Sequence, residues 1–232
     1  MIRRPFTSIF VATAAATVLA LIGGTAAQAG VPDPEPSVTS TPTEVPAEDE
    51  ADKEPTEPVF ADYKGRKINL AESWEDATSC TELPRGEVHC YDTDEEAMTD
   101  PALPSATRQE IVSAAVEARD PSRCVPDYWC LYQHADYKGK ILRFSEDGKK
   151  RLKNWGMNNK LSSVFYRVLR WSVNYGDARV IDWRSWPVAD RARRLSAGRV
   201  GDPSRYPNFK QLDYPGGGNW NDKVDVFEVR RA

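Results

Sequence analysis

Histidine is scarce in this chain: its 232 residues include two, His89 and His134. Neither can be paired from the sequence with a serine, cysteine or threonine nucleophile. Acidic residues are abundant, but no two of them stand at a spacing that defines a catalytic pair, so we interpret them as solvated surface. We therefore predict that the protein is not an enzyme and has no catalytic residues.

A membrane-spanning run is also missing. The longest apolar stretch, Ile9 to Ile22, follows two arginines and precedes the small residues of Ala27-Gln28-Ala29. It is short for a bilayer span, and its flanks are typical of a secretory signal peptide with its cleavage site. We predict a signal peptide over residues 1–29, a secreted mature protein and no membrane span in it. A retained membrane anchor is the alternative.

Apolar residues are almost absent from the next segment. Residues 31–58 hold nine acidic side chains against Lys53 alone, a net charge of −8, among many Pro, Thr and Ser residues. Such a segment buries too little surface to offset its chain entropy. We predict a disordered acidic linker over residues 30–58, serving either as a spacer or as a solubilising tail.

Cysteine is limited to four residues, which allow three disulfide pairings. The local pairs Cys80 with Cys90 and Cys124 with Cys130 each bracket turn-forming residues, and an oxidising exterior lets such bonds persist. Zinc bound by Cys130 and His134 is the rival, but no matching ligand pair lies nearby. We predict the two local disulfides.

The region after the linker divides into two short parts. Residues 59–97 predict a small disulfide-tied α/β module: a strand broken at Lys64-Gly65, a short helix over residues 71–80 and a hairpin between the cysteines. Residues 98–122 predict a helical connector, because Thr107 and Glu110 have the spacing of a capping box.

Residues 123–232 are predicted to be a β domain. Tyr132, Tyr137 and Gly139 place two rings and a flexible glycine at a folded hairpin. A short apolar strand follows over residues 140–144, then a turn at Glu146-Asp147-Gly148, and a last strand over residues 164–166.

The stretch YQHADYKG, followed about twenty residues later by NNKLSS, resembles the Greek-key motif of microbial βγ-crystallins. The resemblance implies a mainly β fold, a double Greek-key sandwich over residues 123–232. The second key would follow residue 168, and its clearest repeat sets residues 219–224 against residues 154–161.

In that family the (N/D)(N/D)xx(S/T)S loop binds calcium, each site combining one motif's loop with a neighbour from the other. The implied metal ligands here are Asn158, Asn159, Ser162, Asn221, Asp222 and Asp225. Calcium prefers such oxygen donors. Asp225 stands where the pattern has a ligating hydroxyl, and Val226 where it has the serine that pins the hairpin. The alternative is that both loops are structural turns.

The order of front module, helix and Greek key also resembles secreted actinobacterial metalloproteinase inhibitors of the Streptomyces type. This resemblance implies a peptidase inhibitor with an extracellular protease as its partner. The second half of the β domain lacks the further cysteines of that family. The alternatives are a calcium-binding structural or adhesive module of the cell envelope, and a toxin-like βγ-crystallin.

Two segments are candidate inhibitory loops. The first is the disulfide loop from Cys124 to Cys130, whose Tyr128 and Trp129 suit a hydrophobic metalloprotease subsite. The second is the arginine-rich stretch from Arg191 to Arg205, which suits a trypsin-like pocket. We predict the disulfide loop and a metalloprotease; in the alternative, both aromatic residues cap the core.

Charge separates along the chain. Residues 59–122 carry 6 basic and 14 acidic side chains, whereas residues 123–232 carry 22 basic and 12 acidic ones. The acidic front is expected to dock on the basic domain or to shield it; the alternative is attraction of the basic domain to anionic wall polymers or nucleic acid. We predict no nucleic-acid partner, because the arginines do not alternate with an aromatic platform, and we expect a monomer.

Overall fold

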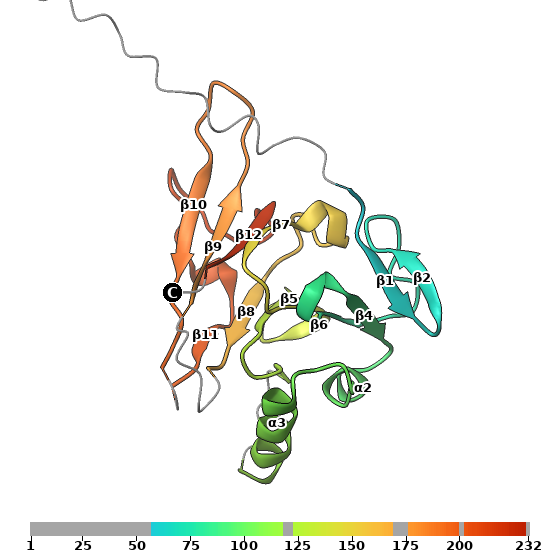
Figure 1. The fold of residues 1–232 in the computed structure, drawn as a ribbon. Coiled ribbons are helices and arrows are strands. Elements are labelled where there is room, and N and C mark those ends of the chain that lie inside the picture. The colour runs from blue at the N-terminus through green and yellow to red at the C-terminus, as the bar shows by residue number, and fades with distance from the viewer. Residues whose placement is uncertain (1–56, 118–122, 169–175, 200–201, 231–232) are drawn as a thin grey trace, which may run out of the picture. The chain divides into compact units, whose positions relative to one another are not determined.

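The computed structural model describes residues 57–117, 123–168, 176–199 and 202–230. Their strands form one sheet of eight strands and one of four, so the predicted mainly β fold is confirmed (Figure 1). The predicted signal peptide and nearly all of the predicted linker lie outside the described residues. Within the described ranges, no helix is long and apolar enough to cross a membrane.

The front segment contributes four strands and a short helix. In chain order they are β1 (Phe60–Tyr63), β2 (Arg66–Asn69), β3 (Ser79–Glu82), β4 (Val88–Tyr91) and α2 (Asp94–Met98), with a 3-10 turn over Pro84–Gly86. A capping box between Thr93 and Glu96 fixes the start of α2.

The predicted helix over residues 71–80 is instead a series of turns that leads into β3. Asn69 Oδ1 accepts a hydrogen bond from Ala71 N at 3.1 Å, and Ser73 Oγ accepts one from Glu75 N at 2.9 Å. These side chains compete with a helix for the backbone donors, as Asn and Ser commonly do in turns.

The front strands belong to the same sheet as the β domain. The order of the larger sheet is β11-β8-β5-β6-β3-β4-β1-β2, and β3 pairs in parallel with β6, which places Cys80 beside Leu142. α3 (Ser105–Glu117) follows α2. It begins before Thr107, so the prediction that Thr107 and Glu110 form the capping box at its start is wrong. Residues 118–122 lie outside the described residues.

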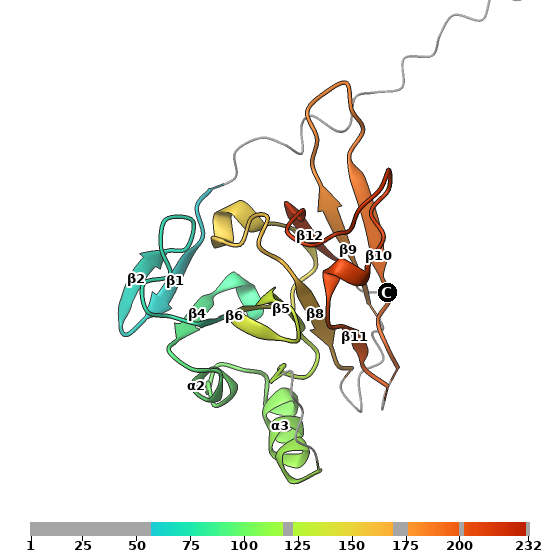
Figure 2. The same cartoon turned by 180° about the vertical axis from the view of Figure 1, so that it is seen from behind.

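The remaining strands are divided between the two sheets. They are β5 (Trp129–His134), β6 (Lys138–Phe144), β7 (Gly148–Arg151), β8 (Ser163–Tyr166), β9 (Asp177–Asp182), β10 (Arg191–Leu195), β11 (Ser204–Tyr206) and β12 (Val226–Arg230), with 3-10 turns over Leu152–Trp155 and Phe209–Gln211. β5, β6 and β8 lie in the larger sheet, while β7 joins the smaller one, whose order is β10-β9-β12-β7. Conversely, β11 lies in the larger sheet, where it pairs with β8, whereas β9, β10 and β12 lie in the smaller sheet. The order is consistent with two Greek keys that exchange their third strands (Figures 1 and 2).

Ser163 pins the first hairpin as its position in the motif implies. Its Oγ donates to the His134 carbonyl at 2.7 Å and accepts from Tyr137 N at 3.2 Å. Tyr132 and Tyr137 pack edge to face, with ring centroids 5.4 Å apart. These contacts hold the bend between β5 and β6 against the start of β8.

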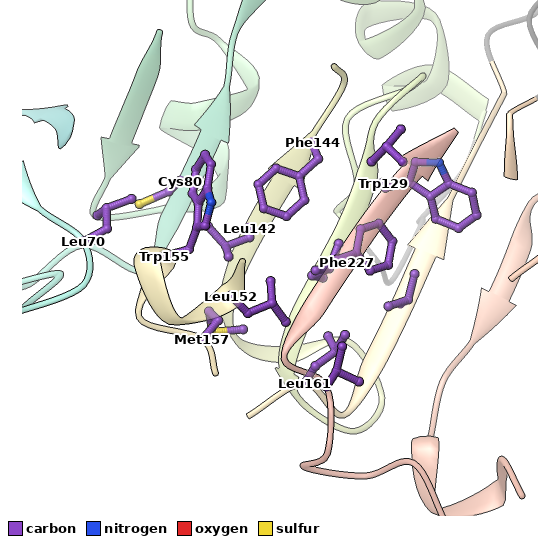
Figure 3. Close-up of a cluster of buried hydrophobic side chains, with 14 of the residues drawn as sticks. Leu70, Cys80, Trp129, Leu142, Phe144, Leu152, Trp155, Met157, Leu161 and Phe227 are labelled. Carbon is purple, nitrogen blue, oxygen red and sulfur yellow. The ribbon is translucent and has the colours of Figure 1, made fainter. Parts of the chain in front are cut away.

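The main core lies between the two sheets and extends under the front strands (Figure 3). Phe144 packs edge to face against Trp155 at 4.7 Å, and Phe227 brings β12 into the same cluster. Trp74 of the front segment donates from Nε1 to the Trp155 carbonyl at 2.8 Å. One continuous apolar core therefore joins the front segment to both halves of the β domain.

Charged pairs also join the acidic front to the basic domain. Arg143 on β6 is fully buried and pairs with Asp94 of α2 at 2.9 Å. Lys150 on β7 pairs with Glu82 on β3 at 2.5 Å, and both side chains are nearly buried. The front segment thus contacts the β domain with its acidic side chains, as its charge predicts.

Candidate functional site

The two loops identified by the Greek-key pattern lie side by side. Asn159 N donates to the Val224 carbonyl at 3.1 Å, and Asp222 N donates to the Leu161 carbonyl at 3.3 Å. Each bond runs from the second residue of one loop to the fourth of the other. Asn159 and Asp222 also share a left-handed backbone, with φ of 51° and 56°. The two loops are therefore related by a local pseudo-twofold axis.

This pairing brings predicted ligands of different loops together on one side. Ser162 Oγ donates to Asp222 Oδ1 across 3.3 Å, and Asn221 Nδ2 donates to Asp222 Oδ2 at 2.5 Å. A hydroxyl of the first motif thus stands beside a carboxylate of the second. This is the combination of loops that the sequence resemblance implies.

Asp225 is the fifth residue of the second loop, the position that Ser162 holds in the first loop. Its carboxylate contacts the Asn158 side chain and the carboxylate of Asp182, and it accepts from Trp183 N at 2.9 Å. Burial raises the pKa of Asp225 above its ordinary value, and the neighbouring Asp182 raises it further. Sequence reasoning missed Asp182, because it lies at the end of β9, outside both loop motifs.

The donor chemistry of these groups suits calcium. Carboxylate, amide and hydroxyl oxygens are what the ion prefers, and a cation between Asp182 and Asp225 would offset their mutual repulsion. Among the described residues, no group of three or more His, Cys, Asp or Glu side chains is placed to hold a metal. Any site here must therefore draw on Asn, Ser and backbone oxygens as well.

The disulfide loop does not present its aromatic residues. Both local disulfides are formed, Cys80 with Cys90 and Cys124 with Cys130. Tyr128 and Trp129, however, are 1% and 2% exposed, and Trp129 stacks on Tyr166 at 4.5 Å. The prediction that these side chains contact a protease is corrected: they belong to the core, because the strand that follows turns them inward.

The arginine-rich stretch is largely sheet rather than loop. Its first five residues form β10, paired antiparallel with β9, and residues 204–206 form β11. Arg193 donates to the Asp213 carbonyl at 3.1 Å and Arg194 pairs with Asp177. Backbone pairing and these bonds hold the arginines along the sheet, so they do not form an extended binding loop.

The exposed feature of this half is the tip of the β9–β10 hairpin, residues 183–190, which extends beyond the neighbouring strands (Figures 1 and 2). Trp186 at the tip is 82% exposed and Val188 is 44% exposed. Contiguous exposed apolar surface commonly marks an interaction site, and these two residues are two positions apart on one turn, so the tip is a candidate for such a site. We refer to residues 183–190 as the hairpin tip.

Several bonds order the hairpin tip. Arg184 N donates to Asp190 Oδ1 at 2.6 Å, which closes the two arms, and Val188 N donates to the Ser185 carbonyl at 3.1 Å. At the base, the Trp183 ring lies 4.8 Å from the Arg151 guanidinium, in addition to its backbone bond to Asp225. The exposed residues therefore stand on a supported turn.

A comparison with known protein families gives a match that ends at Trp183, the first residue of the hairpin tip. Residues 117–183 match the model of peptidase inhibitor family I36. The match covers β5 to β9, and it supports the inhibitor family that the sequence resembles as well as a peptidase-inhibitor function. A non-enzymatic inhibitor with a protease as its partner agrees with this finding. No curated protein and no solved structure shows significant similarity to the chain.

Proposed function

We propose that the protein is a secreted inhibitor of extracellular metalloproteases and that it contacts its target through the hairpin tip. The observation that carries the proposal is the exposed Trp186 on a hydrogen-bonded turn, next to a region similar to peptidase inhibitors. A preordered loop loses little conformational entropy when it enters a cleft, which favours tight binding.

The apolar character of the tip favours a metalloprotease with a hydrophobic subsite over a trypsin-like enzyme. Trp186 and Val188 are the exposed large apolar residues there, whereas Arg184 is only partly exposed. Aromatic anchors of this kind often dominate the binding energy of an interface.

Inhibition assays on a thermolysin-like protease and on trypsin test this proposal. We expect inhibition of the first, weakened about thirtyfold or more by Trp186→Ala, because losing an interface anchor costs about 2 kcal/mol or more. Val112→Ala is the matched control: Val112 is 69% exposed on α3, away from the tip. Inhibition of neither enzyme would favour an envelope module, and inhibition unchanged by Trp186→Ala would exclude the tip.

We further propose that calcium stabilises the paired loops. Asn158, Ser162, Asp182, Asp222 and Asp225 supply the side-chain oxygens, and the reciprocal backbone bonds hold the two loops together. Because Asp225 also binds Trp183 N, an ion bound there would support the base of the hairpin tip.

Thermal unfolding with and without calcium tests this second proposal. Millimolar calcium should raise Tm, since the ion binds the folded loops and not the unfolded chain. Ser162→Ala should remove most of the gain. Lys160→Ala should keep it, because Lys160 Nζ offers no ligand oxygen and donates to the Gly156 carbonyl at 3.1 Å. A wild-type Tm that calcium leaves unchanged would make the loops structural turns.

A further inference from the structure

A groove lies where the chain enters the folded unit. It has a volume of about 390 Å³ and runs between the entering residues and β7. Its lining includes Glu57, Pro58, Phe60, Lys149, Arg151 and Asn154. β7 is the edge strand of the smaller sheet, and Phe60 is 53% exposed. The groove is therefore an open surface beside a sheet edge.

The groove is cationic along β7. This strand carries Lys149, Lys150 and Arg151 in succession, and Glu82 offsets Lys150 from the opposite wall. The register across the smaller sheet sets Lys149 beside Glu228, Glu228 beside Arg179, and Arg179 beside Arg194. The four strands together contain eight basic and three acidic residues. The positive field of the groove thus extends across the sheet.

The segment that precedes the groove in the chain has the opposite charge. Residues 44–56 hold six acidic side chains and one lysine. They lie outside the described residues, but the residue that follows them already contacts the groove: Asn154 Nδ2 donates to the Glu57 carbonyl at 3.3 Å. Thirteen residues reach up to about 40 Å when extended, which suffices to follow β7.

We propose that residues 44–56 bind in cis to this groove and compete there with external polyanions. The covalent connection gives the segment an effective concentration of roughly millimolar order without any partner in solution. Charge complementarity and this tether favour the segment over a free anionic polymer. The contact would be salt-dependent, because such charges are screened over about 10 Å at 0.1 M ionic strength.

Zero-length carbodiimide cross-linking of the full chain, followed by mass spectrometry, tests the contact directly. At low ionic strength we expect amide links between acidic residues of segment 44–56 and Lys149 or Lys150. Their yield should fall several-fold in about 0.5 M NaCl and in the variant Lys149→Gln with Arg151→Gln. The control Lys138→Gln with Arg205→Gln removes two charges from the larger sheet and should keep the yield.

Retention on heparin tests the competition by changing the charge of the segment itself. The four-site variant E48Q, D49N, E50Q and D52N should elute at higher salt than the wild type. The matched variant E72Q, E75Q, D76N and E95Q changes the net charge equally in the front module and should shift less. Equal shifts together with absent cross-links would overturn the proposal. Retention that depends on Lys149 and Arg151 but not on the segment would assign the groove to an external polyanion and also overturn it.

Discussion

Trp129 shows at the scale of a single residue why burial decides a role. In the sequence it stands in a short disulfide loop, a place where an aromatic residue suits a protease subsite. In the structure it begins β5, and its ring packs between Tyr166 and Phe227. Trp186 lies between two strands instead and stays exposed. Trp129 thus belongs to a strand that packs into the core, whereas Trp186 belongs to the connection between two strands.

Gly139 is a second residue whose role follows from its surroundings. Its φ is +80°, and an added Cβ would lie 2.7 Å from His134 Cδ2. Gly65 has a similar φ of +76°, but an added Cβ there would meet nothing within 4 Å. A side chain at Gly65 would therefore meet backbone strain alone, whereas one at Gly139 would meet the same strain and a steric overlap as well.

We expect Gly65→Ala to lower the free energy of unfolding by roughly 1–2 kcal/mol through backbone strain alone. Gly139→Ala should cost roughly 2–4 kcal/mol, because overlap with His134 adds to the same strain. Urea unfolding of both variants measures the difference. Equal losses would show that His134 moves aside and that the aromatic bend tolerates a side chain.

At the scale of elements, the two halves of the β domain use their first hairpin differently. The β5–β6 connection folds back as a bend pinned by Ser163, and its aromatic residues pack inward. The β9–β10 connection is longer and extends as the hairpin tip, with its aromatic Trp186 outward. Val226 stands where Ser163 has its counterpart, so the second hairpin lacks this pin. The same architecture thus supports a structural bend in one half and an exposed loop in the other.

The paired loops connect these elements. Asp225 binds the backbone of Trp183 at the base of the hairpin tip and contacts Asn158 of the first loop. A displacement of the paired loops would therefore be transmitted to the hairpin tip through the Asp225 side chain. This arrangement links the calcium proposal to the inhibitor proposal, while each keeps its own test.

At the scale of the whole molecule, Glu82 and Lys150 join the two sheets through a nearly buried ion pair. Burial raises the pKa of the Glu82 carboxyl above its ordinary value, and the pair with Lys150 offsets only part of this effect. The folded protein therefore holds the Glu82 proton more tightly than the unfolded chain does. The contribution of Glu82 to stability is fully present below the unfolded pKa and is lost as pH rises through the folded one.

Glu82→Gln removes this titration. The free energy of unfolding of the wild type, relative to that of the variant, should fall as pH rises from about 4, the ordinary pKa of a glutamate. Urea unfolding over a series of pH values measures this difference, in which titrations common to both proteins cancel. A difference that grows with pH would show that the pair with Lys150 outweighs the burial of the carboxyl.

The sequence by itself determined the local chemistry of the chain. The disulfide partners, the aromatic bend around Gly139 and the two Asn/Asp loops all depend on neighbours within a few positions, and local spacing encodes them. The acidic front and the basic domain were also evident, because net charge needs no coordinates. The similarity of residues 117–183 to an inhibitor family agrees with the resemblance noted in the motifs.

Only the tertiary structure decided which side chains are buried and which distant segments meet. The exchange of β7 and β11 between sheets, the parallel pairing of β3 with β6 and the contact of Asp182 with Asp225 join residues far apart in the chain. Local spacing carries no information on such pairings, because they depend on how strands of similar pattern are ordered in a sheet. Trp129 therefore became a core residue and Trp186 an exposed one for a reason that lies in the fold.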